Sequence, residues 1–166
     1  EQVTLDPQMA GPYLILSQDH KMLRFSRIRN HGDSPKRFLS CPSILGSQGF
    51  TSGRHYWEVK VGKGGYCALG VALESVPSED QLRSGKVWAL RQKLCGRYTA
   101  VPTPPYPLAV REELQRIRVH LDYEAGRVTF YNAKDMTQIL QFQATFTEKV
   151  FPYFWIRSVD NHIHLC

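Results

Sequence analysis

The stretch that decides the fold is RIRVHLDYEAGRVTFYN, residues 116–132. Apolar side chains alternate with polar ones on both sides of Ala125-Gly126, which indicates two half-buried antiparallel strands joined by a hairpin turn. A two-residue loop at Ala125-Gly126 keeps the apolar side chains on one face, because a slip of one residue would exchange the faces. Gly126 supplies the positive φ that such a turn needs. This register places Glu124 opposite Arg127, Tyr123 opposite Val128 and Leu121 opposite Phe130.

The same stretch holds two carboxylates, Asp122 and Glu124, on one face of the strand, about 6.5–7 Å apart along an ideal strand. Such a spacing would suit the acid and base of an inverting glycosidase. Their neighbours on that face are polar or basic and do not form the apolar environment of a catalytic acid. The pattern therefore favours a hairpin over catalysis, and the sequence predicts no catalytic residue and no enzymatic activity for this domain.

Alternation continues along the chain, with one candidate strand about every ten residues. We predict strands over 13–17, 22–26, 53–61, 65–73, 86–91, 97–101, 116–123, 127–132, 138–144, 150–157 and 162–166. The GKGG segment at 62–65 is predicted to be a hairpin turn between 53–61 and 65–73. Many short strands separated by Gly, Pro, Asn and Asp predict an all-β sandwich or barrel built from antiparallel sheets.

The N-terminal part of the chain, up to Phe50, holds fewer long strands. Asp6 followed by Pro7 predicts one short helical turn, since Asp is a favoured N-cap and Pro a favoured first helical residue. At 166 residues the chain has the length of one domain. We expect a single cooperative unit in which the N-terminal part packs as a subdomain.

Composition narrows the class of protein further. The formal net charge is +6, and residues 81–111 carry six basic side chains and no acidic one. Such a positive surface favours acidic peptides, phosphates or nucleic acid as partners. No apolar run approaches the roughly 18 residues of a membrane helix. The four cysteines lack a CxxC spacing, so we expect reduced thiols, no metal, no cofactor and a cytoplasmic location.

Three motifs in chain order give a resemblance to PRY-SPRY (B30.2-type) domains, the C-terminal modules of tripartite-motif proteins and butyrophilins. They are Leu5-Asp6-Pro7, Trp57-Glu58-Val59 and the LDYEAG sequence at 121–126. The resemblance covers essentially the whole chain, with a PRY part over about 1–50 and a SPRY part over about 51–166. It implies a bent sandwich of two antiparallel sheets that carries variable loops and selects a protein target, as in ubiquitin ligases whose RING domain lies elsewhere.

The resemblance also implies a binding face, formed by loops around 28–36, 62–67, 75–87, 91–97 and 155–162. Relatives place tryptophans in the central pocket, whereas this chain carries the cations Arg91 and Lys93 there. The candidate ligand-binding residues are therefore Arg91, Lys93, Arg97, Tyr98, Trp155, Arg157 and Ala68. We expect them to bind a protein or peptide of acidic character, through a domain that is monomeric on its own and does not insert into a membrane.

Several alternatives stay open at this stage. RNA binding through the basic, aromatic loop surface is the second hypothesis, and a butyrophilin-type ligand sensor is a further one. The C-terminal HxHxC, residues 162–166, could ligate zinc, but Ile163 and Leu165 between its ligands favour a core strand. Trp155 and Phe154 lie on opposite faces of one strand, so either one could face inward. His55 is expected on the apolar face of its strand.

Overall fold

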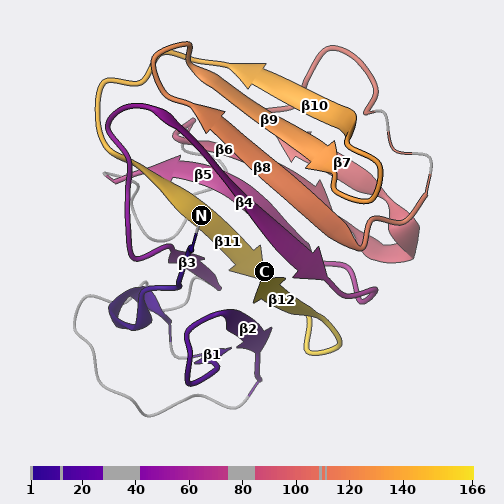
Figure 1. Cartoon of the computed structure of the whole chain (residues 1–166). Helices are drawn as coiled ribbons and strands as arrows, with labels where there is room; N and C mark the ends of the chain where they lie inside the picture. The colour runs from indigo at the N-terminus through magenta and orange to yellow at the C-terminus, as the bar shows by residue number, and fades with distance from the viewer. Residues whose placement is uncertain (1, 12, 28–41, 75–84, 109, 111) are drawn as a thin grey trace.

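The computed structural model describes residues 2–11, 13–27, 42–74, 85–108, 110 and 112–166. Two antiparallel sheets pack face to face, which confirms the predicted all-β sandwich (Figure 1). In Figure 1, β4, β8, β9 and β10 run across the front of the view, and β5 and β6 lie behind them.

The larger sheet has seven strands in the order β1-β2-β12-β4-β8-β9-β10. Their bounds are Leu14–Leu16, Met22–Phe25, His162–Leu165, Arg54–Val61, Arg116–Asp122, Arg127–Asn132 and Thr137–Gln143, respectively. Alternate residues of β4 and β8 are buried, so one face of this sheet packs on the core and the other faces solvent.

The smaller sheet has five strands in the order β3-β11-β5-β6-β7. Their bounds are Ser43–Leu45, Val150–Ile156, Cys67–Leu73, Val87–Gln92 and Tyr98–Val101. Strands β5 and β11 are buried on both faces. Phe154 and Ile156 point into the main core between the sheets, whereas Tyr153 and Trp155 belong to a second apolar cluster on the outer face of this sheet. Phe154 therefore faces the main core and Trp155 the opposite side of the sheet, and both side chains are buried.

The predicted strands agree with the structure to within two residues at each end. The sequence did not predict β3. Asp6 caps a 3-10 turn at Pro7–Met9 by accepting a hydrogen bond from the Gln8 N–H (3.0 Å), which confirms the short helical turn. The N-terminal part contributes to both sheets: β1 and β2 extend the larger sheet through β12, and β3 joins the smaller sheet.

The central hairpin keeps its predicted faces but not its predicted register. Leu121 stands opposite Val128 and Asp122 opposite Arg127, so the loop spans four residues, 123–126, and the two-residue loop was wrong. The prediction missed by two residues, a shift that preserves which side chains face inward. Gly126 has φ +71°, and its N–H donates to the Tyr123 carbonyl (3.2 Å) to close the turn.

Tyr123 explains why the turn is longer. Its hydroxyl donates to the Glu148 carbonyl (2.8 Å), and its ring lies 5.5 Å from that of Phe146. These contacts draw Tyr123 out of the strand ladder. Glu124 does not pair with Arg127 as predicted. Both of its carboxylate oxygens instead accept from the Gly53 N–H at 2.9 Å.

A second correction concerns GKGG. Strand β4 pairs with β8 and β12 in the larger sheet, while β5 pairs with β6 and β11 in the smaller one. Residues 62–66 therefore cross from one sheet to the other and are not a hairpin turn. The crossing needs positive φ at Gly65 and Tyr66 (+71° and +51°), and strand alternation alone does not reveal the change of sheet.

Candidate functional site

One end of the sandwich gathers four loop segments, 62–66, 93–97, 112–115 and 157–161, which we call the loop end. A backbone hydrogen bond from the Arg157 N–H to the Tyr66 carbonyl (2.9 Å) joins 157–161 to 62–66, and one from the Lys93 N–H to the Arg97 carbonyl (2.7 Å) closes the segment 93–97 on itself. The Leu114 N–H donates to the Tyr98 hydroxyl (2.7 Å), which ties 112–115 to strand β7. The loop end is thus one connected surface drawn from both sheets.

Two glycines allow these loops to approach closely. A Cβ on Gly64 would lie 2.7 Å from the Asp160 carbonyl oxygen, and one on Gly65 would lie 3.0 Å from the backbone of Lys93 and Leu94. Asn161, which is 2% exposed, fixes the crossing further by donating from its side chain to the Gly65 carbonyl (2.9 Å). The glycine-rich segment that might suggest a phosphate loop is therefore required for packing.

Three of the candidate residues lie side by side on the outer face of the smaller sheet. Arg91 on β6 stands opposite Ala68 on β5, and Ala68 stands opposite Trp155 on β11. The Arg91 guanidinium reaches across the Ala68 methyl group and lies 5.1 Å from the centre of the Trp155 ring. We call these three residues the Arg91 cluster.

Burial in the Arg91 cluster is uneven. Ala68 is fully buried, Trp155 is 8% exposed and Arg91 is half-buried. The Arg91 Nε is buried and has no hydrogen-bond partner among the described residues. A guanidinium that is partly desolvated and incompletely paired favours an added acceptor, because hydrogen bonds to charged groups are worth about 1.5–3 kcal/mol.

The other predicted residues occupy different positions. Lys93, Arg97 and Arg157 are exposed on the loop end, next to the Arg91 cluster in sequence. Tyr98 stands opposite Gln92, and its ring packs against the main core on the opposite face of the sheet from Arg91. Burial raises the pKa of the Tyr98 hydroxyl, and the hydrogen bond from Leu114 partly opposes this effect. Tyr98 therefore supports the loop end from within and does not join the Arg91 cluster.

Two of the expected binding loops, 28–36 and most of 75–87, lie outside the described residues. Cys41 does so as well. Of the remaining cysteines, Cys95 and Cys166 are exposed and Cys67 is buried beneath the loop end. Burial raises the pKa of the Cys67 thiol to about 12, so this side chain stays protonated.

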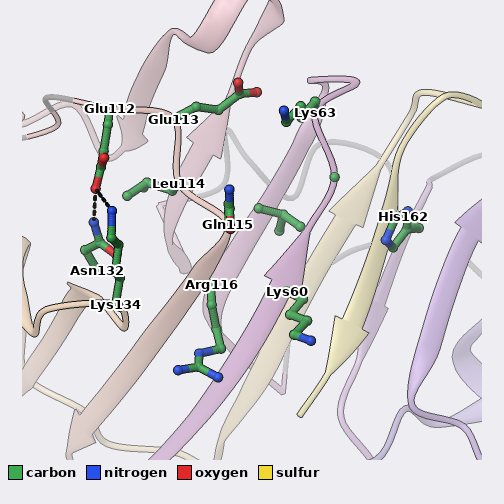
Figure 2. Close-up of a pocket in the computed structure, with 12 residues that line it drawn as sticks. Lys60, Lys63, Glu112, Glu113, Leu114, Gln115, Arg116, Asn132, Lys134 and His162 are labelled. Carbon is green, nitrogen blue, oxygen red and sulfur yellow. Dashed lines mark hydrogen bonds and ion pairs between the residues drawn. The ribbon is translucent and has the colours of Figure 1, made fainter.

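A groove of about 650 Å³ adjoins the loop end (Figure 2). One wall is the segment 112–116 and the other is the end of β4 with Lys63 and His162. Glu112 is held by Lys134 (3.5 Å) and by the Asn132 side-chain amide (3.4 Å), so this carboxylate is fixed at one end of the groove. With Glu113 and several cations in its lining, the groove offers both signs of charge to a ligand. Sequence reasoning missed it, because its lining comes from four separate segments.

The residues considered above for catalysis or metal binding have structural roles. Asp122 pairs with Arg54 (3.3 Å) and accepts from the Ala125 N–H (3.2 Å) inside the hairpin. Ile163 and Leu165 are buried core residues, as expected from the HxHxC alternation. His55 faces the core, where it stacks on Phe50 with a centroid distance of 3.8 Å. Within the described ranges, no group of three His, Cys, Asp or Glu side chains could hold a metal ion, and no helix is long and apolar enough to cross a membrane.

Comparison with protein families decides the identity of the fold. The model of the SPRY domain matches residues 54–165, and the model of the SPRY-associated domain, PRY, matches residues 3–50. The chain belongs to the PRY-SPRY family. It is therefore a protein-interaction module, as are the SPRY domains of tripartite-motif proteins.

Curated relatives of this PRY-SPRY domain are longer proteins. It is 46% identical over 160 residues to the E3 ubiquitin-protein ligase TRIM15 of Sus scrofa, covering 92% of this chain and 34% of the relative. It is 42% identical over 153 residues to nuclear factor 7, ovary, of Xenopus laevis, covering 90% and 25%. The chain thus spans a quarter to a third of the length of these relatives.

Solved structures share the fold. The PSpry domain of TRIM65 superposes with a TM-score of 0.80 at 22% identity, covering all of this chain and 90% of that one. Stonustoxin superposes with a TM-score of 0.85 at 25% identity, covering 99% of this chain and 28% of the toxin chain. The same sandwich therefore occurs in proteins of different overall organisation.

Proposed function

We propose that this PRY-SPRY domain is the target-recognition module of a tripartite-motif-type protein and binds an acidic segment of its target at the loop end and the adjoining Arg91 cluster. The observation that carries the proposal is the Arg91 cluster, in which a half-buried guanidinium is stacked on Trp155 while its Nε lacks a hydrogen-bond partner among the described residues. A carboxylate or phosphate of the target would bind the exposed part of the Arg91 side chain, since Nε itself is shielded from solvent.

The charge around the cluster supports the same ligand. Lys63, Lys93, Arg97 and Arg157 are exposed on the loop end. Its carboxylates are Asp160 and, on segment 112–115, Glu112 and Glu113, so the cations outnumber the acids by one. None of the four cations is in an ion pair with a described residue. Charge-assisted hydrogen bonds to a ligand are therefore available without first breaking an ion pair to any residue that the structure describes.

The enzymatic activity of any full-length protein is a separate matter. The resemblance to TRIM15 supports a RING-type ubiquitin ligase in which this domain selects the substrate and other domains catalyse the transfer. A cytoplasmic location accords with that role.

The test uses a displayed library of random peptides selected on the wild-type domain, followed by affinity measurements on the selected peptides. We expect enrichment of Asp and Glu. The loop triple variant, Lys93→Gln with Arg97→Gln and Arg157→Gln, should lose at least tenfold in affinity, since the loss of even one hydrogen bond to a charged group costs about 1.5 kcal/mol or more.

A matched control removes the same charge from another surface. The face triple variant, Arg24→Gln with Lys60→Gln and Arg127→Gln, lies on the outer face of the larger sheet and leaves the net charge equal to that of the loop triple variant. Peptide affinity should change less than threefold in this control. Selection of peptides without acidic residues, or equal losses in both variants, would show that the target does not bind as proposed.

A further inference from the structure

The outer face of the larger sheet carries a concentration of positive charge that the loop end does not explain. On β2, β4, β8 and β9, the side chains that alternate with the core residues include six basic residues and two acidic ones. The basic residues are Arg24, Arg54, Lys60, Arg116, Arg118 and Arg127, and the acidic ones are Glu58 and Asp122. We call this surface the basic face. It lies on β4, β8 and β9 across the front of Figure 1.

Like charges stand directly opposite one another on the basic face. Lys60 on β4 pairs across the ladder with Arg116 on β8. Like charges at opposed positions destabilise a sheet. Glu58 offsets the charge of Arg116, through a contact of 3.3 Å to Nε, whereas Lys60 forms no ion pair with a described residue. Figure 2 shows Lys60 and Arg116 projecting to the same side of the sheet, away from Glu112 and Glu113. This arrangement favours an external anion.

An aromatic side chain lies among these cations. Tyr56 is 45% exposed on β4, and the Arg118 guanidinium lies 4.7 Å from the centre of its ring. Arg118 is itself fixed by Glu58, to which its Nε donates at 2.6 Å. On the other side, Arg118 stands opposite Tyr131 on β9, which is half-buried. Tyr56 and Tyr131 thus flank a guanidinium held in one position.

We infer that the basic face binds single-stranded nucleic acid, with the phosphates on the cations and one base stacked on Tyr56. Stacking platforms surrounded by basic residues are the usual means of binding single strands without sequence preference, and a base can stack on the ring of Tyr56. An acidic peptide would use the charges but not the ring, and a duplex would keep its bases away from Tyr56. This inference concerns a surface other than the loop end and does not depend on the proposed function.

The probe is a fluorescent twelve-residue oligouridylate, U12, titrated with the domain in a fluorescence anisotropy assay between 50 and 200 mM salt. Each phosphate contact contributes about 0.7 to the slope of log affinity against log salt for a single strand. The face triple variant should therefore reduce the slope by about 2. The loop triple variant, with the same net charge, should change it by less than 0.7.

Tyr56→Ala separates stacking from charge. We expect a loss of roughly tenfold in U12 affinity with an unchanged salt slope, because stacking contributes about 1–3 kcal/mol per base and involves no counterion. Circular dichroism and thermal unfolding check that the variant folds, and Tyr56→Phe, which keeps the ring, should bind U12 within a factor of about two.

Four outcomes would overturn the inference: no U12 binding at 50 mM salt, equal slope changes in the two triple variants, equal affinity for a twelve-base-pair RNA duplex, or displacement of U12 by a twelve-residue oligoglutamate at equal charge concentration. The last would assign the face to acidic protein. Peptide capture at the loop end is measured separately, so either proposal can fail while the other survives.

Discussion

Gly126 is the residue at which a single methyl group should do most damage to the central hairpin. At this position φ is +71°, and an added Cβ would lie 1.7 Å from the carbonyl oxygen of Ala144 and 2.8 Å from its carbonyl carbon. The obstacle is backbone and cannot rotate away. The Gly126 carbonyl also accepts from the Ala144 N–H (2.7 Å), so moving the two segments apart breaks a hydrogen bond.

The cost of Gly126→Ala follows from three contributions. An L-residue in the left-handed region costs about 1–2 kcal/mol. Overpacking that forces backbone to move costs about 1–3 kcal/mol, and the lost hydrogen bond about 1 kcal/mol. We therefore expect a decrease of about 4 kcal/mol in the free energy of unfolding. For a chain of this size, that corresponds to a fall in Tm of roughly 8–16 °C.

Gly96 offers a matched control, because its φ is +67° and nothing lies within 4 Å of an added Cβ. Gly96→Ala should cost about 1 kcal/mol from the backbone conformation alone. Urea unfolding followed by Trp fluorescence measures both variants, and Gly126→Asn tests the clash again with a residue that tolerates positive φ. If Gly126→Ala falls within about 1 kcal/mol of Gly96→Ala, the close approach to Ala144 does not limit this position.

Two further predictions concern groups beneath the loop end. Tyr98→Phe removes the acceptor of the Leu114 N–H and should lower the free energy of unfolding by about 1–2 kcal/mol, measured by thermal melts. The control is Tyr106→Phe, which removes a hydroxyl that donates to the Gln141 carbonyl (3.1 Å) at an exposed site and should change the stability by less than about 0.5 kcal/mol. Equal effects of the two variants would contradict this prediction. Because burial raises the pKa of Cys67, the folded chain keeps the thiol proton to about pH 12, whereas the unfolded chain loses it above about pH 8.5. The contribution of this proton to the free energy of unfolding is therefore complete below about pH 8.5 and is lost as the pH rises towards 12. Between pH 7.5 and 9.5, wild type should lose about 1 kcal/mol more than Cys67→Ala in urea unfolding, and parallel pH profiles would refute the assignment.

Strand positions could be predicted from the sequence because each strand of the larger sheet buries one face. Pairing could not be predicted to the same degree. Placing Leu121 opposite Phe130 or opposite Val128 leaves the same side chains inside, so the apolar pattern does not distinguish the two registers. The choice depends on the Tyr123 hydroxyl and its bond to the Glu148 carbonyl, a contact between distant residues.

The candidate site was predictable in part. Resemblance to the family placed Arg91, Ala68 and Trp155 together, and the structure shows them in one row of the smaller sheet. The inward face of β11 could not be chosen from the sequence, because the strand is buried on both sides and Phe154 and Trp155 are each apolar. The face of β7 on which Tyr98 lies was open for a related reason, since an aromatic residue beside cations can lie on either face of the strand.

The participation of the N-terminal part in both sheets has a consequence for how this module is inherited. Leu5, Leu23 and Ile44 are completely buried in the main core, and β2 hydrogen-bonds to β12, the last of the described strands in chain order. The two segments matched by separate family models thus share one core and both sheets. An exchange of the N-terminal segment between relatives would have to preserve the side chains it buries and the register of β2 against β12. Recombination is therefore expected to move the module whole, leaving change in binding preference to substitutions on exposed positions.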